Sequence, residues 1–223
     1  MSETIKTIAV LGGTGQVGYG LALRWALNGY EVIVGSRTEE KATAAADEMK
    51  AAYPEAQVKG MHNEAAAEAC DLVVLSVPYS AHQSTLETVK PFLSGKILID
   101  LTVPLVPPKV STVQLPEGQA ATLEAQAFLG EDVQVVAAFQ NVGAVKLKDP
   151  NNEIECDVFV CSNSKAARET VSTLVEAAGL RPIDAGALAN AIAAESLTAL
   201  LIHINKTYKV PGAGIRITGI GKD

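Results

Sequence analysis

A glycine-rich segment directly after an apolar run is the first feature of this chain that could do chemistry. Residues 7–18 read TIAVLGGTGQVG, in which Gly13, Gly15 and Gly18 fit the spacing G-x-G-x-x-G. In that spacing the first glycine permits a tight turn, the second lets the backbone approach a pyrophosphate, and the third lets a helix pack on the strand. Backbone N–H groups at the helix start then bind the phosphates, so the segment predicts a dinucleotide site. The alternative is a glycine-rich turn without a ligand.

The next apolar run ends in residues that suit a further phosphate. Residues 31–37 read EVIVGSR, so Ser36 and Arg37 stand where NAD-binding proteins usually carry Asp or Glu. Arg37 can form a bidentate pair with a phosphate, and Ser36 can donate its hydroxyl. Lys41 follows four residues later on a predicted helix and adds a second cation on the same side. We therefore expect NADP rather than NAD, the alternative being a solvated helix start with incidental charges.

Three further turns follow predicted strands and form the candidate substrate side. They are residues 75–79 (LSVPY), 103–104 (VP) and 140–144 (QNVGA). Because the carboxyl ends of parallel strands meet at one edge of a sheet, we expect these turns to converge near the nicotinamide. Gln140 and Asn141 directly follow a predicted buried strand and are candidates for hydrogen bonds to a substrate. The alternative is that they only cap the strand and tie the loop.

The C-terminal segment Val210–Gly221 (VPGAGIRITGIG) combines glycine with apolar residues. Such a segment could fray, or it could fold back and let its backbone approach a flat ring. In the second arrangement Arg216 would be placed to meet an anionic group.

Other catalytic patterns are missing from the chain. His62, His82 and His203 show no metal-ligand spacing with one another or with a cysteine, and there is no G-x-S-x-G. We expect no metal and no catalytic acid or base, with Gln140 the one candidate for a catalytic contact. A dinucleotide without such groups predicts hydride transfer between two ring systems, in which positioning supplies most of the rate.

The elements that must position these residues alternate along the chain. Strands are predicted at 5–11, 31–35, 57–60, 72–77, 96–100, 133–139, 157–161 and 181–184. Helices are predicted at 16–28, 39–52, 64–69, 82–92, 120–129, 165–178 and 188–207. Apolar strands alternating with helices predict an α/β fold, a Rossmann-type doubly wound parallel sheet covered on both faces.

The chain is expected to divide at the polar, turn-rich stretch 146–153 (KLKDPNNE). Residues 1–145 would form an NADP-binding Rossmann domain. Residues 146–223 would form a small C-terminal α/β extension that packs on it and completes the substrate site. Residues 102–116 contain four prolines and are predicted to be a long loop at the carboxyl end of the fifth strand.

Composition narrows the class of protein and its partners. With 223 residues, 48% of them hydrophobic and 19% charged, the chain is long and apolar enough for one compact α/β domain with a small appendage. Its net charge of −7 disfavours nucleic acid or an anionic membrane as the main partner. The N-terminus lacks the pattern of a signal peptide, and Glu195 interrupts the longest apolar run. We expect three reduced cysteines and a cytoplasmic location.

The residues resemble a known family at this point. VLGGTGQVGYGLALRWALNGYEVIVGSRTEEKA resembles the N-terminus of the NADPH-dependent F420 reductases, also called F420H2:NADP⁺ oxidoreductases. The likeness continues through LSVPYSAH, VAAFQNVGA, CDVFVCSNS, GLRPIDAGALANA and ESLTALLIHINKTYKVPGAGIRITG, so it covers nearly the whole chain. The resemblance implies a reversible hydride transfer between NADP(H) and the deazaflavin coenzyme F420. It also implies a homodimer, for which the apolar last helix would be suited.

The resemblance assigns roles to particular positions. The pyrophosphate would be held by Gly13, Thr14, Gly15, Gln16 and Val17, and the 2′-phosphate by Ser36, Arg37 and Lys41. The nicotinamide ribose and ring would be lined by Val77, Tyr79, Val103, Ala144 and Ala213. The deazaflavin would lie against Pro104, Gln140, Asn141 and Val142. Some members carry His in place of Gln140, and Gln can donate one hydrogen bond but cannot titrate near neutral pH.

Three other functions stay open on the residues. An NADPH-dependent flavin reductase would place FMN or FAD where the deazaflavin is expected. A reductase of a small carbonyl or imine shares the N-terminal pattern but generally has a longer helical C-terminal region. A module that binds NADP without turnover is the third alternative.

Overall fold

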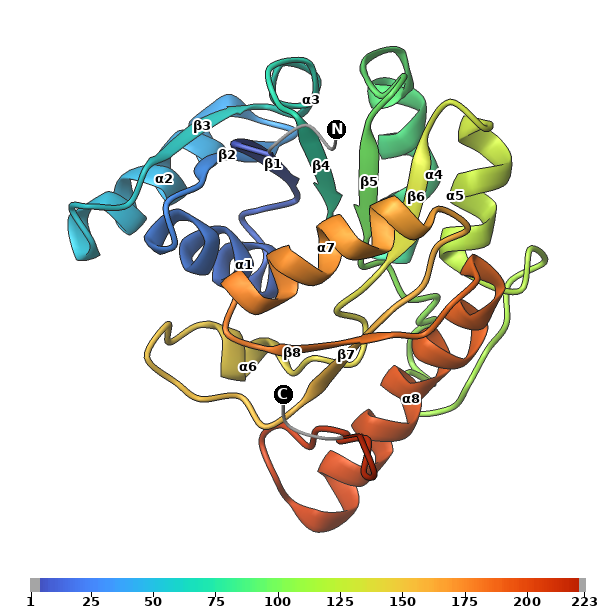
Figure 1. Ribbon diagram of the computed structural model, residues 1–223. Helices are drawn as coiled ribbons and strands as arrows, with labels where there is room; N and C mark the ends of the chain where they lie inside the picture. The colour runs from blue at the N-terminus through green and yellow to red at the C-terminus, as the bar shows by residue number, and fades with distance from the viewer. Residues whose placement is uncertain (1–4, 221–223) are drawn as a thin grey trace.

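Six parallel strands form the central sheet of the protein (Figure 1). The structure is a computed structural model and describes residues 5–220. The strands run in the order β3-β2-β1-β4-β5-β6, so the order reverses between β1 and β4. They are β1 (Thr7–Leu11), β2 (Glu31–Ser36), β3 (Val58–His62), β4 (Leu72–Leu75), β5 (Ile97–Asp100) and β6 (Gln134–Ala137). This topology confirms the predicted doubly wound α/β fold and places a ligand crevice beyond the carboxyl ends of β1 and β4.

Helices cover both faces of the sheet because successive strand residues point to opposite sides. The helices are α1 (Gln16–Leu27), α2 (Glu39–Ala52), α3 (Asn63–Glu68), α4 (Tyr79–Val89), α5 (Ala121–Leu129), α6 (Ala144–Leu147), α7 (Lys165–Ala177) and α8 (Ala191–Tyr208). Short 3₁₀ helices span Lys90–Phe92 and Leu188–Asn190. Ile8 and Val10 of β1 enter one core cluster, whereas Ala9 and Leu11 enter the other. Both clusters are almost wholly aliphatic, as the low aromatic content predicts.

The C-terminal part of the chain packs on this sheet. β7 (Asp157–Val160) and β8 (Arg181–Asp184) form a separate two-stranded parallel sheet, and a single antiparallel bridge joins Ala137 to Cys161. α7 crosses in front of the main sheet in Figure 1, and its Val171 and Val175 belong to the core cluster of α1. The indole nitrogen of Trp25 donates to the carbonyl of Leu174 at 2.8 Å, which ties α1 to α7.

Several boundaries differ from the prediction for local reasons. β4 and β6 stop at Leu75 and Ala137, two residues short of expectation, because the chain turns out of the sheet there. The fourth helix begins at Tyr79 rather than His82. It tightens into a 3₁₀ turn at Lys90–Phe92, where Pro91 has no N–H to continue the helix. The four-residue α6 was not predicted, since one helical turn carries too little periodicity.

The last helical stretch has the length and composition of a membrane-spanning helix but is partly buried in the protein. Residues Leu188–Tyr208 are long and apolar enough, by length and composition alone, to cross a bilayer, with a mean hydropathy of 1.2. One third of that stretch is buried inside the protein (33%), and it includes Glu195, whose side chain bonds to α5. α8 therefore has one packed side and a more exposed side.

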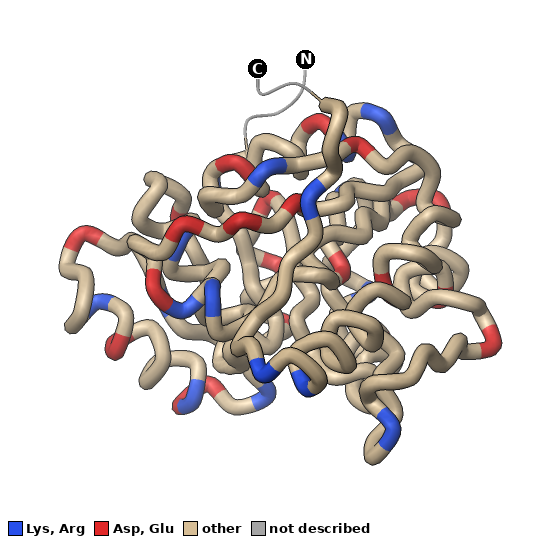
Figure 2. Tube along the Cα trace, turned by 90° about the horizontal axis from the view of Figure 1, so that it is seen from below, with Lys and Arg blue, Asp and Glu red and all other residues tan. Residues whose placement is uncertain are grey.

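Figure 2 shows acidic and basic residues interspersed along the trace rather than separated into one basic surface.

Candidate active site

In the turn between β1 and α1, glycines pack closely against the neighbouring backbone. Gly12 has a φ of +76°, and a Cβ there would lie 2.3 Å from the carbonyl oxygen of Ser76. The left-handed residue of this turn is therefore Gly12, and Gly13 follows it inside the turn that the bond from Gly15 N–H to the Gly12 carbonyl closes at 2.9 Å. A Cβ on Gly18 would lie 2.9 Å from the oxygen of Gly12, so the helix packs against the turn as expected. α1 begins after Gly15 without a side-chain cap, which leaves its first N–H groups for an anion.

A hollow of about 470 Å³ opens beside this turn, and we call it the phosphate hollow. It brings Thr14 together with Ser36, Arg37 and Lys41, which come from the end of β2 and the start of α2. Within residues 5–220, no Asp or Glu lines it. The hollow therefore has the charge expected of a site for an anionic group.

Asn63 is a residue of the phosphate hollow that sequence reasoning missed. It lies at the start of α3, its side chain is 5% exposed, and its Oδ1 has no hydrogen-bond partner. Its sequence signal is only that it directly follows β3, and a single polar residue there is too common to single out. An unpaired amide oxygen at this place can accept a hydrogen bond from a donor in the hollow.

A larger hollow of about 720 Å³, the central cleft, lies on the other side of Pro78. Its lining includes the predicted residues Gly15, Gln16, Val17, Val77, Tyr79, Val103, Gln140, Asn141, Val142, Ala144 and Ala213. The two hollows share Gly15, Ser76, Val77 and Pro78, so they adjoin at the start of α1.

Two predicted residues lie outside both hollows. Gly13 is packed inside its turn, where a Cβ would be 2.7 Å from the oxygen of Val10. Pro104 is buried and lines a small separate hollow with Glu195. The far wall of the central cleft contains residues that were not predicted, namely Leu105, Pro107, Val110, Thr198, Leu201, Ile202 and Asn205. Leu105, Pro107 and Val110 belong to the proline-rich loop predicted at the end of the fifth strand, whereas helical periodicity cannot show which side of α8 faces the cleft.

The turn after β6 fixes two amide side chains in the cleft wall. Phe139 has a φ of +70°, a strained value for an aromatic residue. The Nε2 of Gln140 donates to the carbonyl of Asp100 at 2.8 Å, and the Nδ2 of Asn141 donates to the carbonyl of Asp157 at 2.7 Å. Because a carbonyl cannot donate, these contacts settle which end of each amide is nitrogen. One of the two N–H donors of Gln140 is thus in use, and its buried Oε1 has no hydrogen-bond partner.

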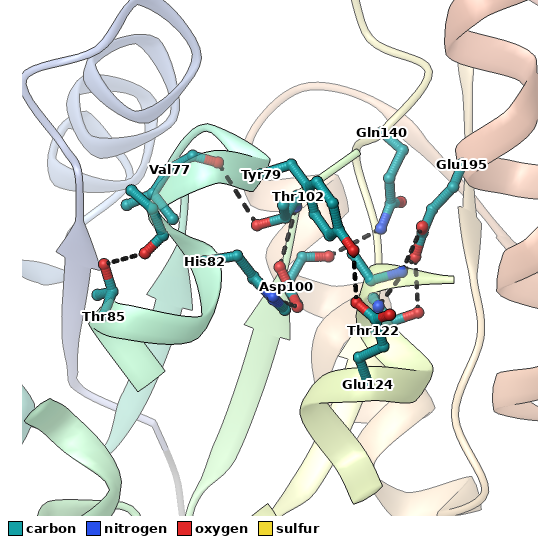
Figure 3. A network of polar contacts seen from close by, with 12 residues as sticks. Val77, Tyr79, His82, Thr85, Asp100, Thr102, Thr122, Glu124, Gln140 and Glu195 are labelled. Atoms are coloured by element: carbon teal, nitrogen blue, oxygen red, sulfur yellow. Dashed lines mark hydrogen bonds and ion pairs between the residues drawn. The ribbon is translucent and has the colours of Figure 1, made fainter. Parts of the chain in front are cut away.

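Below the cleft lies a buried polar network (Figure 3). Tyr79 donates its hydroxyl to Glu124 at 2.9 Å, and burial together with that bond raises the pKa of Tyr79 to about 12. Its ring lies 6.2 Å from that of His82, centroid to centroid. Glu195 accepts from the backbone N–H groups of Ala121 and Thr122 at 2.8 and 3.0 Å.

The network leaves the cleft surface itself without a group that titrates near neutral pH. Tyr79 is the one titratable side chain that lines the central cleft within residues 5–220. With its pKa raised to about 12, Tyr79 stays protonated over the physiological range. The cleft can therefore bind flat, mostly apolar ligands and hold them in place, and it offers no general base.

Comparison with known proteins agrees with this geometry. The family model described as "NADP oxidoreductase coenzyme F420-dependent" matches residues 7–104. An F420-dependent NADP reductase from Methanothermobacter marburgensis is 43% identical over 220 residues, which cover 96% of this chain and 98% of that protein. The chain belongs to the F420-dependent NADP reductase family. This confirms the resemblance found in the sequence.

Other members and structures extend the comparison. The F420-dependent NADP reductase from Methanocaldococcus jannaschii is 41% identical over 221 residues, covering 96% of this chain and 98% of that one. A crystal structure of a protein from Arthrobacter sp. FB24 matches with a TM-score of 0.79 at 26% identity, covering 96% of this chain and all of that one (100%). The similarity to these proteins thus covers nearly the whole chain, including the proline-rich loop at residues 102–116 and α8.

Proposed function

We propose that this protein is an NADP-dependent oxidoreductase that transfers a hydride reversibly between NADP(H) and coenzyme F420. The observation that carries this function is the 43% identity with an F420-dependent NADP reductase over nearly the full length of both proteins. Family membership does not favour the alternatives, which are a flavin reductase, a carbonyl or imine reductase and a non-catalytic NADP-binding module.

The phosphate hollow is the proposed site of the adenosine end of NADP. Arg37 and Lys41 enter no ion pair within residues 5–220, so both cations are available to a 2′-phosphate. Ser36, which is 8% exposed, lies behind them and can add its hydroxyl. The pyrophosphate would lie at the start of α1, against the backbone of residues 13–17.

The central cleft is the proposed site of the two rings. When both are bound, the nicotinamide and the deazaflavin supply the carbon atoms between which the hydride moves. Val77, Tyr79, Val103, Ala144 and Ala213 would hold the nicotinamide and its ribose. These side chains exclude water and fix the ring, and a hydride transfer between aligned carbons gains most of its rate from such positioning.

The deazaflavin would stack on the turn Gln140-Asn141-Val142. The turn is held from two sides, because Asp100 accepts the Gln140 amide and Thr198 of α8 donates to the Gln140 carbonyl at 2.7 Å. One of the two N–H groups of the Gln140 amide is therefore committed to Asp100, which holds the side chain in a fixed orientation beside the ring. Pro104 does not line the central cleft, so it would act on the deazaflavin site indirectly, by holding the loop that carries Val103.

Assembly, domain division and location also belong to the proposal. Residues 1–145 would bind NADP, and residues 146–223 would complete the substrate site and contribute the homodimer contact. α8 supports a dimer contact because Leu200 is 48% exposed on it. The enzyme would act in the cytoplasm, where small soluble cofactors are its partners.

An absorbance assay tests the function directly. Protein, NADPH and oxidised F420 are mixed, and the visible band of F420 is followed against the same mixture with NADH and with FMN in place of F420. We expect NADPH-dependent bleaching that is much slower with NADH. No bleaching at any pH or salt concentration would overturn the proposal. Faster reduction of FMN would show a flavin reductase, and tight NADPH binding without turnover would show a binding module.

A further inference from the structure

The C-terminal segment of residues 211–217 returns to the cleft and is held by a part-buried ion pair, in which Arg181 is 28% exposed. Asp157 of β7 is 1% exposed, and Arg181 of β8 donates to both of its carboxylate oxygens, at 2.7 and 2.5 Å. The same two side chains bind the C-terminal segment. The N–H of Ile217 donates to Asp157 at 2.6 Å, and Arg181 donates to the Ile217 carbonyl at 2.8 Å.

Backbone contacts extend this junction toward the cleft. The N–H of Asp157 donates to the carbonyl of Ile215 at 2.8 Å, so the segment lies alongside the start of β7. A Cβ on Gly214 would lie 2.8 Å from the carbonyl oxygen of Glu155, so only glycine fits this approach. The N–H of Ala213 donates to Asn205 of α8 at 2.7 Å. Ala213 is thus fixed between α8 and β7 where it lines the cleft.

Asp157 also holds the turn after β6, which lies beside the C-terminal segment: a Cβ on Gly143 would be 3.5 Å from the Cα of Gly212. Its backbone carbonyl accepts the amide of Asn141 at 2.7 Å, and that bond sets the orientation of the Asn141 side chain. One buried residue therefore connects the C-terminal segment to the turn that follows β6. A change at the side chain of Asp157 or Arg181 would loosen the C-terminal segment beside this turn without removing any group that lines the cleft.

We propose that Asp157 and Arg181 are positioning residues, which act through Ala213 and Asn141 to fix these two neighbouring parts of the lining of the ring-binding cleft. The role assigned to the cleft rests on the proposed function. The contacts of Asp157 and Arg181 with the C-terminal segment, which we call the clamp, do not rest on the proposed function, because they are a property of the protein alone. Arg181 suits this position because its planar fork can bind both carboxylate oxygens and still reach a carbonyl, which a lysine ammonium cannot do.

The test compares Arg181→Gln with Arg168→Gln. Arg168 is a matched control, since it pairs with Asp184 of β8 at 2.7 Å and with the Ser162 carbonyl but does not contact the C-terminal segment. Amide hydrogen exchange of residues 211–217 is measured on the protein without ligands. We expect about tenfold faster exchange in Arg181→Gln, from the loss of charge-assisted hydrogen bonds, and wild-type exchange in Arg168→Gln.

Kinetics provide the second readout. Arg181→Gln should raise the KM for NADPH about tenfold while changing kcat much less, because binding geometry is loosened and no reacting contact is lost. Arg181→Lys should fall between the wild type and Arg181→Gln. Unchanged exchange in Arg181→Gln, equal loosening in Arg168→Gln, or faster exchange with an unchanged KM would each overturn the proposal. If no variant and no wild-type protein reduces F420, exchange and NADPH binding still decide whether the clamp exists.

Discussion

The Nε2 of His82 lies 2.7 Å from the Oδ2 of Asp100, and both side chains are almost fully buried, at 2% and 0% exposure. The second carboxylate oxygen of Asp100 accepts from the N–H of Thr102 at 2.9 Å. Burial lowers the pKa of His82, but the hydrogen bond and charge of Asp100 raise it more, so the net shift is upward. The pair joins α4 to the end of β5, directly beneath the ring of Tyr79.

Replacing His82 with Ala is expected to destabilise the protein by about 3–5 kcal/mol, because it leaves a buried carboxylate without its partner. Urea unfolding gives the free energy. His62→Ala is the matched control, since His62 pairs with Glu64 at 2.9 Å but both side chains are more than 40% exposed (43% and 45%). That exposed pair should be worth less than about 1 kcal/mol. Equal losses in the two variants would contradict a structural role for the buried pair.

Glu195 predicts a pH dependence of stability. Burial raises its pKa from 4.5 to about 7, against the opposing effect of the hydrogen bonds from Thr122 and Ala121. The folded state therefore holds a proton that the unfolded state releases, so this contribution is present below pH 4.5 and is lost as the pH rises to about 7. Relative to Glu195→Gln, the wild type should lose about 3 kcal/mol of unfolding free energy over that interval.

The measurement is urea unfolding of both proteins across that pH range. Glu169→Gln is the control, because Glu169 is exposed on α7 and should track the wild type at every pH. A constant difference between wild type and Glu195→Gln would show that Glu195 does not titrate in this interval.

The position of Arg37 in the phosphate hollow leads to a prediction about the preference for NADPH over NADH. Arg37→Ala should reduce the preference for NADPH over NADH, measured as the ratio of kcat/KM values, by about 10- to 150-fold. That range corresponds to the 1.5–3 kcal/mol of one charge-assisted phosphate contact. Lys59→Ala is the control, since Lys59 is exposed on β3 and does not line the phosphate hollow. Unchanged discrimination in Arg37→Ala would show that its guanidinium points away from the phosphate.

The exposed position of Leu200 on α8 leads to a prediction about the oligomeric state. Leu200→Asp places a charge on the exposed side of α8, and it should convert a homodimer to a monomer, because a buried unpaired charge is too costly to keep. Light scattering after gel filtration measures the mass. Val145→Asp on α6 carries the same change at a residue that is 62% exposed and should leave the mass unaltered. A wild-type protein that elutes as a monomer would exclude the dimer proposal.

Local patterns in the sequence determined the fold class and the location of the phosphate hollow. The glycine turn, the Ser36-Arg37 end of β2 and the alternation of strands with helices are each contained within a few tens of residues. They depend on backbone freedom, side-chain periodicity and charge, which are properties of the residues themselves. The same patterns did not show that Gly12 is the left-handed residue of the turn, because that depends on its close approach to the carbonyl of Ser76.

Tertiary structure alone decided how the cleft is closed and which groups face it. Glu195 reaches Thr122 across 73 residues, and Ile217 reaches Asp157 across 60. The orientation of the Gln140 amide depends on the carbonyl of Asp100, 40 residues away. Such contacts have no local signature, because they exist only after the chain has brought distant segments together. The sequence thus determined the glycine turn and the cationic residues at which we propose that the dinucleotide binds, and packing decided the shape and polarity of the central cleft.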